Sequence, residues 1–306
     1  MRKRSKVSVV GVALIAASVA TVGLVATPGV TQASKPPPLL YLSLGDSYSV
    51  GFQPGMGATA GYTSYVAKKE KMTLENFGCG GATTSSILSV IGCPGPTYGP
   101  TALIDPVAYP ATTQEQAAVN FIAAPANFGK VGLVTVSIGG NDVTACAGAA
   151  DPVTCVTAAT TTIQTNVTSL VGTLSSALTT HGDSSAKIAG LTYPDVILGD
   201  YVHQPTNVSL ANLSIVAFHA LINPTLQAAY TSVAGGSFVN VTEAPYKLAT
   251  AGDETPLTTT AKLNPYGTIP VAVWEICRLT YFCTLGNIHA NTNGYTFIAK
   301  LVVADL

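Results

Sequence analysis

The chain has 306 residues, of which 47% are hydrophobic and only 9% are charged. Residues 1–33 hold four of its 14 basic residues and none of its 15 acidic ones, so the rest of the chain carries 14 − 4 = 10 bases against 15 acids, a net charge of −5. This balance argues against a nucleic-acid partner and against a polybasic patch that holds a protein on an anionic membrane. The apolar content excludes a largely disordered chain.

The first 33 residues have the pattern of a secretory signal peptide. Four basic residues precede a long apolar run, and small residues at Thr31 and Ala33 are typical of a cleavage site. We expect cleavage after Ala33, a secreted, extracellular protein and no stable membrane anchor. A Pro-rich segment at 34–39 then leads into one predicted domain at 40–306. An uncleaved anchor is the alternative, because the run is roughly 20 residues long; no later segment is predicted to span a membrane.

Six cysteines lie as three pairs of near neighbours along the sequence. Disulfides are favoured in an exported chain, although six cysteines allow many pairings. The pairs that adjacency favours are Cys79–Cys93, Cys146–Cys155 and Cys277–Cys283. A zinc site is the alternative, but the sequence has no Cys-x-x-Cys pair and no histidine at ligand spacing from one.

The predicted elements begin with a buried strand in residues 38–46 that ends at Gly45-Asp46. A helix is predicted over 63–72. Residues 74–91 predict a short strand, a Gly-rich turn and a helix that begins at Thr83-Thr84. A strong apolar strand within 130–142 then runs into a Gly-Gly-Asn-Asp turn.

The second half of the chain repeats this alternation. A long helix is predicted over 153–181, followed by a strand within 186–198, a helix over 209–233 and a fifth strand within 235–244. Residues 287–306 predict a loop that leads into a C-terminal helix. Strands that alternate with helices of this length indicate an α/β fold, an open and mainly parallel sheet covered by helices on both faces.

Three polar turns each follow a predicted strand: Ser47, the Gly-rich turn at 78–81 and the turn at 139–142. Ligands of open α/β sheets bind outside the carboxyl ends of the strands. The three turns are therefore predicted to face one crevice.

Four motifs occur in order along the chain: GDSYS at 45–49, NFGCGGATT at 76–84, SIGGND at 137–142 and NIHANTNGY at 287–295. Together they resemble the SGNH hydrolases, also called GDSL esterases and lipases, and most closely their secreted actinobacterial branch. The resemblance spans nearly the whole predicted domain. It implies a flavodoxin-like α/β/α sandwich with a five-stranded sheet, hydrolysis of acyl esters, and neither a metal nor an organic cofactor.

The resemblance also implies a role for each motif. Ser47 corresponds to the nucleophile and His289 to the general base. The backbone amides of Ser47 and Gly81 and the side-chain amide of Asn141 correspond to an oxyanion hole. The chemistry requires these residue types, because a serine hydroxyl must lose its proton to a base as it attacks and the resulting oxyanion needs fixed hydrogen-bond donors.

Each of these residues also has a purely structural interpretation. Ser47 is suited to cap a helix after the strand. Gly81 is suited to a turn with positive φ, and Asn141 is a common turn residue. Of the other histidines, His181 is predicted at a helix end and His219 within an apolar helical stretch, whereas His203 lies in a polar segment and is a candidate to line a substrate cleft.

The acid of the usual triad is missing from its usual place. Family members commonly carry an aspartate three residues before the histidine, where this chain has Gly286, followed by Asn287. We therefore predict a Ser47–His289 dyad. Its histidine is oriented either by a main-chain carbonyl near Gly286 or by the amide oxygen of Asn287, with a distant acid such as Glu275 as a further alternative.

The function that follows is a secreted carboxylic-ester hydrolase that forms an acyl-serine intermediate on an acyl-ester or lipid substrate, expected to act as a monomer. Phospholipid and carbohydrate esters are alternative substrates of the same machinery. The segment 243–282 carries Trp274, Tyr281 and Phe282, which either line an acyl site or pack the base of a long loop. A catalytically impaired member that binds cell wall or lipid is the second class of function.

Overall fold

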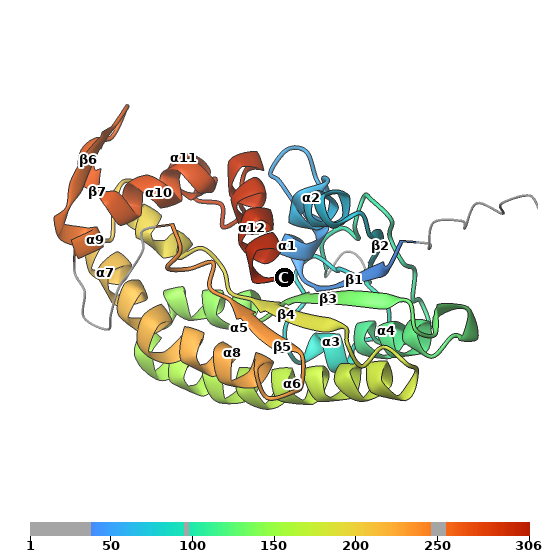
Figure 1. The fold of residues 1–306 in the computed structure, drawn as a ribbon. Helices are drawn as coiled ribbons and strands as arrows, with labels where there is room; N and C mark the ends of the chain where they lie inside the picture. The colour runs from blue at the N-terminus through green and yellow to red at the C-terminus, as the bar shows by residue number, and fades with distance from the viewer. Residues whose placement is uncertain (1–37, 95–97, 246–254) are drawn as a thin grey trace, which may run out of the picture. The chain divides into compact units, whose positions relative to one another are not determined.

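The computed structural model describes residues 38–94, 98–245 and 255–306. The expected signal peptide at 1–33 and most of the segment 34–39 lie outside these residues. Five strands form one parallel sheet in the order β2-β1-β3-β4-β5 (Figure 1), which confirms the predicted sheet. The strands are β1 (Leu40–Gly45), β2 (Thr73–Asn76), β3 (Val131–Ser137), β4 (Lys187–Leu191) and β5 (Gly236–Val239).

Helices cover both faces of this sheet, as predicted for a three-layer sandwich (Figure 1). One face carries α2 (Gly61–Glu70) and α12 (Thr292–Asp305). The other carries α4 (Gln114–Ile122), α6 (Pro152–Thr180) and α8 (Asn223–Tyr230). The short helices are α1 (Ser47–Val50), α3 (Ser86–Ser89), α5 (Gly140–Thr144) and α9 (Thr255–Thr258), with 3-10 turns at Pro125–Asn127, Ala145–Gly148 and Val196–Tyr201.

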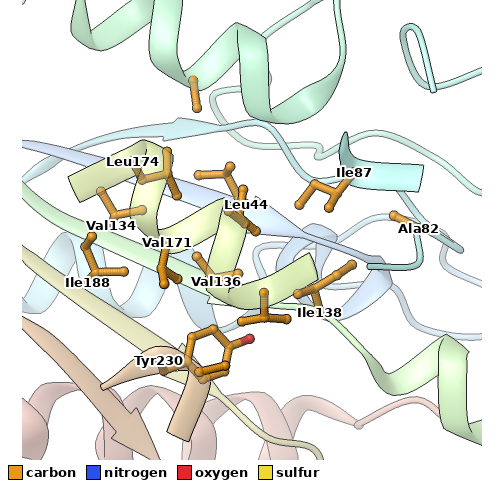
Figure 2. Packing of buried hydrophobic residues seen from close by; sticks show 14 of the residues in the cluster. Leu44, Ala82, Ile87, Val134, Val136, Ile138, Val171, Leu174, Ile188 and Tyr230 are labelled. Atoms are coloured by element: carbon orange, nitrogen blue, oxygen red, sulfur yellow. The ribbon is translucent and has the colours of Figure 1, made fainter. Parts of the chain in front are cut away.

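Strand alternation divides the core between the two faces, because successive side chains of a strand point to opposite sides. In β1, Leu42 and Leu44 belong to the buried cluster that also contains residues of α6, whereas Tyr41 packs with residues of α2 and α12. Figure 2 shows the first cluster, in which Val136 of β3 and Val171 of α6 are completely buried. Full burial of such a side chain contributes about 1.5–3 kcal/mol.

The helix predicted over 209–233 is divided. It consists of α7 (Val208–Ala217), a π-helical turn at Phe218–Ile222 and α8. Pro224 has no N–H to donate to the carbonyl four residues earlier, so the regular series of α-helical backbone hydrogen bonds is interrupted here. By length and composition alone, Val208–Tyr230 is long and apolar enough to cross a membrane, although no span was predicted after residue 33. Burial of α8 side chains against the sheet accounts for part of that composition.

The segment 243–282 contains more regular structure than the expected long loop, and its part at 246–254 lies outside the described residues. It holds an antiparallel pair, β6 (Thr260–Leu263) and β7 (Gly267–Pro270), and then α10 (Val271–Leu279). The helix α11 (Phe282–Leu285) follows. Strands of four residues are too short to show a clear alternation in the sequence, which explains why they were missed.

The structure joins the cysteines as Cys79–Cys93, Cys146–Cys155 and Cys277–Cys283, the pairing that adjacency favoured. No cysteine in the described ranges is free. The bridges close separations of 14, 9 and 6 residues. Each bridge therefore stiffens a local segment rather than joining distant parts of the chain.

The strand order places one crevice at the centre of the sheet. β1 lies between β2 and β3, so the chain adds β2 on one side of β1 and then crosses back to add β3 on the other side. Ligands of doubly wound folds bind at the carboxyl ends of the strands where the strand order reverses in this way. Gly45 at the end of β1 is in register with Ser137 at the end of β3. The turns that follow these two strands therefore begin at the same level.

Candidate active site

The turn after β1 depends on a glycine. Gly45 has φ of 136°, and a Cβ added there would lie 2.1 Å from the backbone oxygen of Ser137. The buried Gln114 side chain holds both polar groups of this glycine, accepting from its N–H at 2.6 Å and donating to its carbonyl at 3.1 Å. The backbone from which Asp46 and Ser47 follow is therefore held in place.

Asp46, and not Ser47, caps the helix that starts here. The Asp46 side chain accepts a hydrogen bond from the Tyr48 backbone N–H at 2.9 Å. Ser47 is the first residue of α1, with its Oγ directed to His289, and 7% of the residue is exposed. Its backbone N–H lies at a helix start, where no carbonyl of the helix can accept it.

His289 lies in the loop between α11 and α12. Its Nε2 is 2.9 Å from Ser47 Oγ, across 242 positions of sequence. Its Nδ1 is 2.7 Å from the side-chain oxygen of Asn287, which also accepts from the backbone N–H of His289 at 3.1 Å. An amide oxygen can only accept, so Nδ1 carries the proton and Nε2 presents its lone pair to the serine.

Burial controls the charge of this histidine. The His289 ring lies against Phe52, with ring centroids 4.5 Å apart. Removal of the imidazole from water lowers the pKa of His289 from 6.5 to about 4. The ring is therefore neutral at neutral pH, the form that accepts a proton.

The turns at 78–84 and 139–142 meet beside Ser47. Asn141 Nδ2 donates to the carbonyl of Ala82 at 2.8 Å, and Asp142 accepts from the N–H and hydroxyl of Thr84 at 3.0 and 2.6 Å. Gly81 is exposed, with φ of 80°. The structure thus brings together all three strand-end turns that the sequence predicts at one crevice.

A family model for the GDSL-like lipases and acylhydrolases matches residues 41–302. The chain belongs to this GDSL-like family. The match spans most of the 306 residues, which confirms the family that the motifs resemble. Membership supports an ester hydrolase.

A comparison of this GDSL-family chain with solved structures finds similar proteins at low sequence identity. A lipase from a goat rumen metagenome is 17% identical, with 87% of this chain and 96% of that chain covered and a TM-score of 0.49. An extracellular lipase from Streptomyces rimosus is 18% identical, with 86% and 98% covered and a TM-score of 0.48. An aryl esterase from M. smegmatis is 12% identical, with 88% and 100% covered and a TM-score of 0.38. A comparison with curated proteins finds no match.

Several residues that contact the site in this GDSL-family member were not singled out from the sequence. Tyr193 donates its hydroxyl to Asp46 Oδ2 at 2.6 Å, and Asn141 Nδ2 lies 3.4 Å from the same oxygen. Burial raises the pKa of Asp46 to about 7. Tyr48 donates its hydroxyl to the carbonyl of Ile288 at 2.7 Å and so links the serine turn to the histidine loop. Tyr48 stands within the first motif, whereas no pattern in the sequence marks Tyr193.

The backbone at Gly286 is unfavourable for an aspartate. Gly286 ends α11 with φ of 62°, and a Cβ there would lie 2.5 Å from Nε2 of His203. An aspartate at this position would need left-handed backbone and a displaced imidazole. The distant-acid alternative finds no support, because Glu275 binds Arg278 at 2.6 Å. Among the described residues, the hydrogen bonds of the His289 ring go to Ser47 and Asn287.

Among the described residues, none of the other three histidines bonds to Ser47 or His289, and His203, the candidate for a substrate cleft, is not in the lining of the cavity described below. His181 follows the last residue of α6 and stacks on Phe128, as its predicted helix-end position suggests. His219 lies in the π-helical turn, with Nδ1 2.8 Å from Glu243 Oε1. His203 packs edge-on against Phe282. Within the described ranges, no group of three or more His, Cys, Asp or Glu is arranged to hold a metal ion.

An apolar cavity of about 810 Å³, its open mouth included, begins beside Asp46 and Asn141. Its walls come from Tyr48, from residues 140–156 and 193–222, and from Ile288. The aromatic residues proposed from the sequence do not line it. Phe282 is buried next to Gly199 instead. Tyr281 donates its hydroxyl to Gln53 at 2.9 Å, and the Arg278 guanidinium lies over the Trp274 ring. Trp274, Tyr281 and Phe282 therefore pack this part of the chain and do not line the cavity.

Proposed function

We propose that the protein hydrolyses carboxylic esters through an acyl-serine intermediate on Ser47, with His289 as the base. The observation that carries this proposal is the 2.9 Å contact between Ser47 Oγ and His289 Nε2, with the histidine neutral and its Nδ1–H bound to Asn287. Family membership supports the ester substrate.

Acylation starts with attack of Ser47 Oγ on the ester carbonyl carbon, as the hydroxyl proton passes to His289 Nε2. The carbonyl oxygen becomes an oxyanion, which receives hydrogen bonds from the Ser47 and Gly81 backbone amides and from the Asn141 amide. Collapse of this intermediate breaks the bond to the alcohol oxygen, and the leaving oxygen takes the proton from Nε2. Ser47 then carries the acyl group.

Deacylation repeats the sequence with water as the nucleophile. Water gives a proton to His289 Nε2 and attacks the acyl carbon, and the second oxyanion occupies the same donors. Collapse breaks the bond to Ser47 Oγ, which recovers its proton from Nε2, and the carboxylic acid leaves. No step requires a group that the chain's own residues and water do not supply.

Purified protein is expected to release p-nitrophenolate from p-nitrophenyl acetate and to be labelled covalently by a fluorophosphonate. The second candidate is a catalytically impaired binding protein, which the glycine at the family's aspartate position favours. Folded protein that neither releases p-nitrophenolate nor takes the label would reject the hydrolase in favour of this candidate.

We also propose that the protein is exported and loses residues 1–33. The pattern at 1–33 and the three disulfides, which persist in oxidising compartments, support export. N-terminal sequencing of protein recovered from the medium should begin at Ser34; a start at Met1 would exclude this cleavage.

Asn287→Ala is expected to lower kcat about 10- to 100-fold. The hydrogen bond between Asn287 and the charged imidazolium that forms during the reaction is worth about 1.5–3 kcal/mol. Unchanged kcat in this variant would instead favour the main-chain carbonyl near Gly286 as the group that orients the histidine.

Asn287→Asp is expected to move the acid limb of the pH profile. Wild-type kcat/KM should fall only as the pH approaches about 4, because the base is active when deprotonated and the pKa of His289 is about 4. A carboxylate beside Nδ1 favours the charged ring and should raise the pKa of His289 by roughly 1–3 units, so activity is lost at higher pH than in wild type. An acid limb that stays in place would contradict the contact between residues 287 and 289.

Tyr48→Phe is expected to lower kcat about 2- to 10-fold with KM unchanged. It removes one neutral hydrogen bond, worth roughly 0.5–1.5 kcal/mol, that holds the carbonyl of Ile288 next to the histidine. Tyr266→Phe is the matched control, because it removes a tyrosine bond of 3.0 Å to the carbonyl of Cys283. Equal kcat in Tyr48→Phe and Tyr266→Phe would show that the Tyr48 bond does not position the base.

A further inference from the structure

The cavity beside Asn141 has walls that are mainly carbon. One wall is a single face of α7 and the π-helical turn, formed by Leu210, Leu213, Ala217, Phe218 and Ile222. These positions recur at helical spacing, so the cavity runs along the helix rather than across it. The twelve steps from Leu210 to Ile222 correspond to roughly 18 Å at 1.5 Å per residue.

The facing wall is also apolar. It is formed by Val143, Ala147, Val153 and Val156, from α5, the 3-10 turn after it and the first turns of α6. The Cys146–Cys155 bridge joins the last two of these segments, and Cys146 itself lines the cavity. This wall is therefore covalently tied in place.

Apart from Asn141, which is assigned to the oxyanion, the polar side chains in the lining are already bound within the protein. Thr144 Oγ1 donates to the carbonyl of Gly140 at 2.7 Å. Ser214 Oγ lies 2.8 Å from Asp195 Oδ2, and Tyr193 donates to Asp46. A hydroxylated or charged chain would lose its hydrogen bonds to water and find these groups occupied. An unsubstituted hydrocarbon chain makes no hydrogen bonds to water and so loses none on entering the cavity.

The position of the cavity relative to the dyad separates the two halves of an ester. The leaving alcohol oxygen must reach His289 Nε2 to take a proton. The cavity is bounded by Gly140 and Asn141 on the oxyanion side and by Tyr48 and Ile288 next to the dyad, whereas Ser47 and His289 themselves are not in its lining. Because Asn141 lines the cavity and His289 does not, the lining favours entry of the acyl half, which stays on the serine, over entry of the alcohol.

We propose, on the basis of the hydrolase function above, that this cavity binds the acyl chain of the substrate and selects unsubstituted chains of about 8–14 carbons. An extended chain advances about 1.3 Å per carbon, so roughly 18 Å of wall holds chains of this length. Burial of each added methylene should raise kcat/KM by up to about fourfold until the wall ends.

The first test uses wild-type protein and p-nitrophenyl esters from acetyl to hexadecanoyl, below the concentrations at which they form micelles. The gain from acetyl to decanoyl should be at least about 100-fold, with no further gain beyond about 14 carbons. A flat series, or a maximum at acetyl, would overturn the acyl assignment while turnover of the acetyl ester still upheld the hydrolase. No turnover of any ester and no fluorophosphonate label would reject the hydrolase itself.

The second test varies the alcohol at constant acyl group, using acetate esters of alcohols from ethanol to decanol. We expect kcat/KM to change less than about tenfold over this series, because the alcohol lies on the solvent side of His289. A rise as steep as that expected for the acyl series would show that the cavity takes the alcohol, and it would overturn the proposal.

Two neighbouring substitutions locate the effect in the cavity. Ala217→Trp fills the middle of the helical wall and should lower the ratio of decanoyl to acetyl kcat/KM at least about tenfold. Val216→Trp is the matched control, because Val216 is 58% exposed and does not line the cavity. An equal change of the ratio in both variants, or in neither, would contradict the assignment, and the wild-type series decides the matter if Ala217→Trp does not fold.

Discussion

Replacement of Ser47 by alanine is expected to lower kcat/KM for p-nitrophenyl esters by at least about 10⁴-fold and to abolish labelling by a fluorophosphonate. The covalent intermediate cannot form without the Oγ that lies 2.9 Å from His289 Nε2. In the serine-protease template, loss of the nucleophile removes nearly all of the triad's contribution, and the remaining acceleration comes from the oxyanion hole and from binding.

The Ser47→Ala variant should fold normally, because the helix cap is the Asp46 carboxylate and not the serine hydroxyl. Its thermal midpoint should therefore stay close to that of wild type. Ser89→Ala is the control, since Ser89 is an exposed serine of α3 whose Oγ donates to the local carbonyl of Ser85. Ser47→Ala protein that still forms the adduct would identify another residue as the nucleophile and reject the dyad.

Asn141→Ala is expected to lower kcat about 10²- to 10³-fold with little change in KM. The loss of one oxyanion donor typically costs roughly 2.7–4 kcal/mol of barrier lowering, and the donor acts on charge that exists only after attack. Its amide nitrogen has two hydrogens, of which one is engaged by the carbonyl of Ala82 at 2.8 Å. The other N–H meets Asp46 Oδ2 at 3.4 Å, a longer contact that the oxyanion would replace.

Asn166→Ala is the matched control for Asn141→Ala. The Asn166 amide also donates to the turn after the glycines, to the hydroxyls of Thr84 and Ser85 at 3.2 and 3.0 Å. It supports the same turn without occupying the position assigned to the oxyanion donor, so its loss should change kcat less than about threefold. Similar kcat values for both variants would show that Asn141 only supports the turn.

The parts of the fold that the sequence predicts well are long or strongly patterned. The strand that ends at Gly45-Asp46 and the helix over 153–181 correspond closely to β1 and α6. The π-helical turn and the β6–β7 pair were missed. Both depend on local detail, namely one proline within an apolar helix and strands of four residues, that hydrophobic periodicity does not resolve.

The candidate site divides along similar lines. The motif order predicts Ser47, Gly81, Asn141 and His289, because each stands in or beside a strand-end turn or before the last helix. The cavity was not predicted, because its walls come from segments that are separated in the chain and carry ordinary aliphatic residues. Trp274 and Phe282 were conspicuous in the sequence, yet they pack elsewhere.

By itself, the sequence determined the GDSL-like family, the parallel α/β architecture and the residues of the candidate dyad and oxyanion hole, since these depend on local patterns and their order. Only the tertiary structure decided which oxygen faces His289. Gly286 and Asn287 are adjacent and equally plausible in the sequence, but in the structure it is the side-chain oxygen of Asn287 that lies 2.7 Å from Nδ1, while Gly286 has left-handed backbone beside His203. Side-chain direction across a loop depends on backbone dihedrals and on packing against distant residues, which no local pattern records.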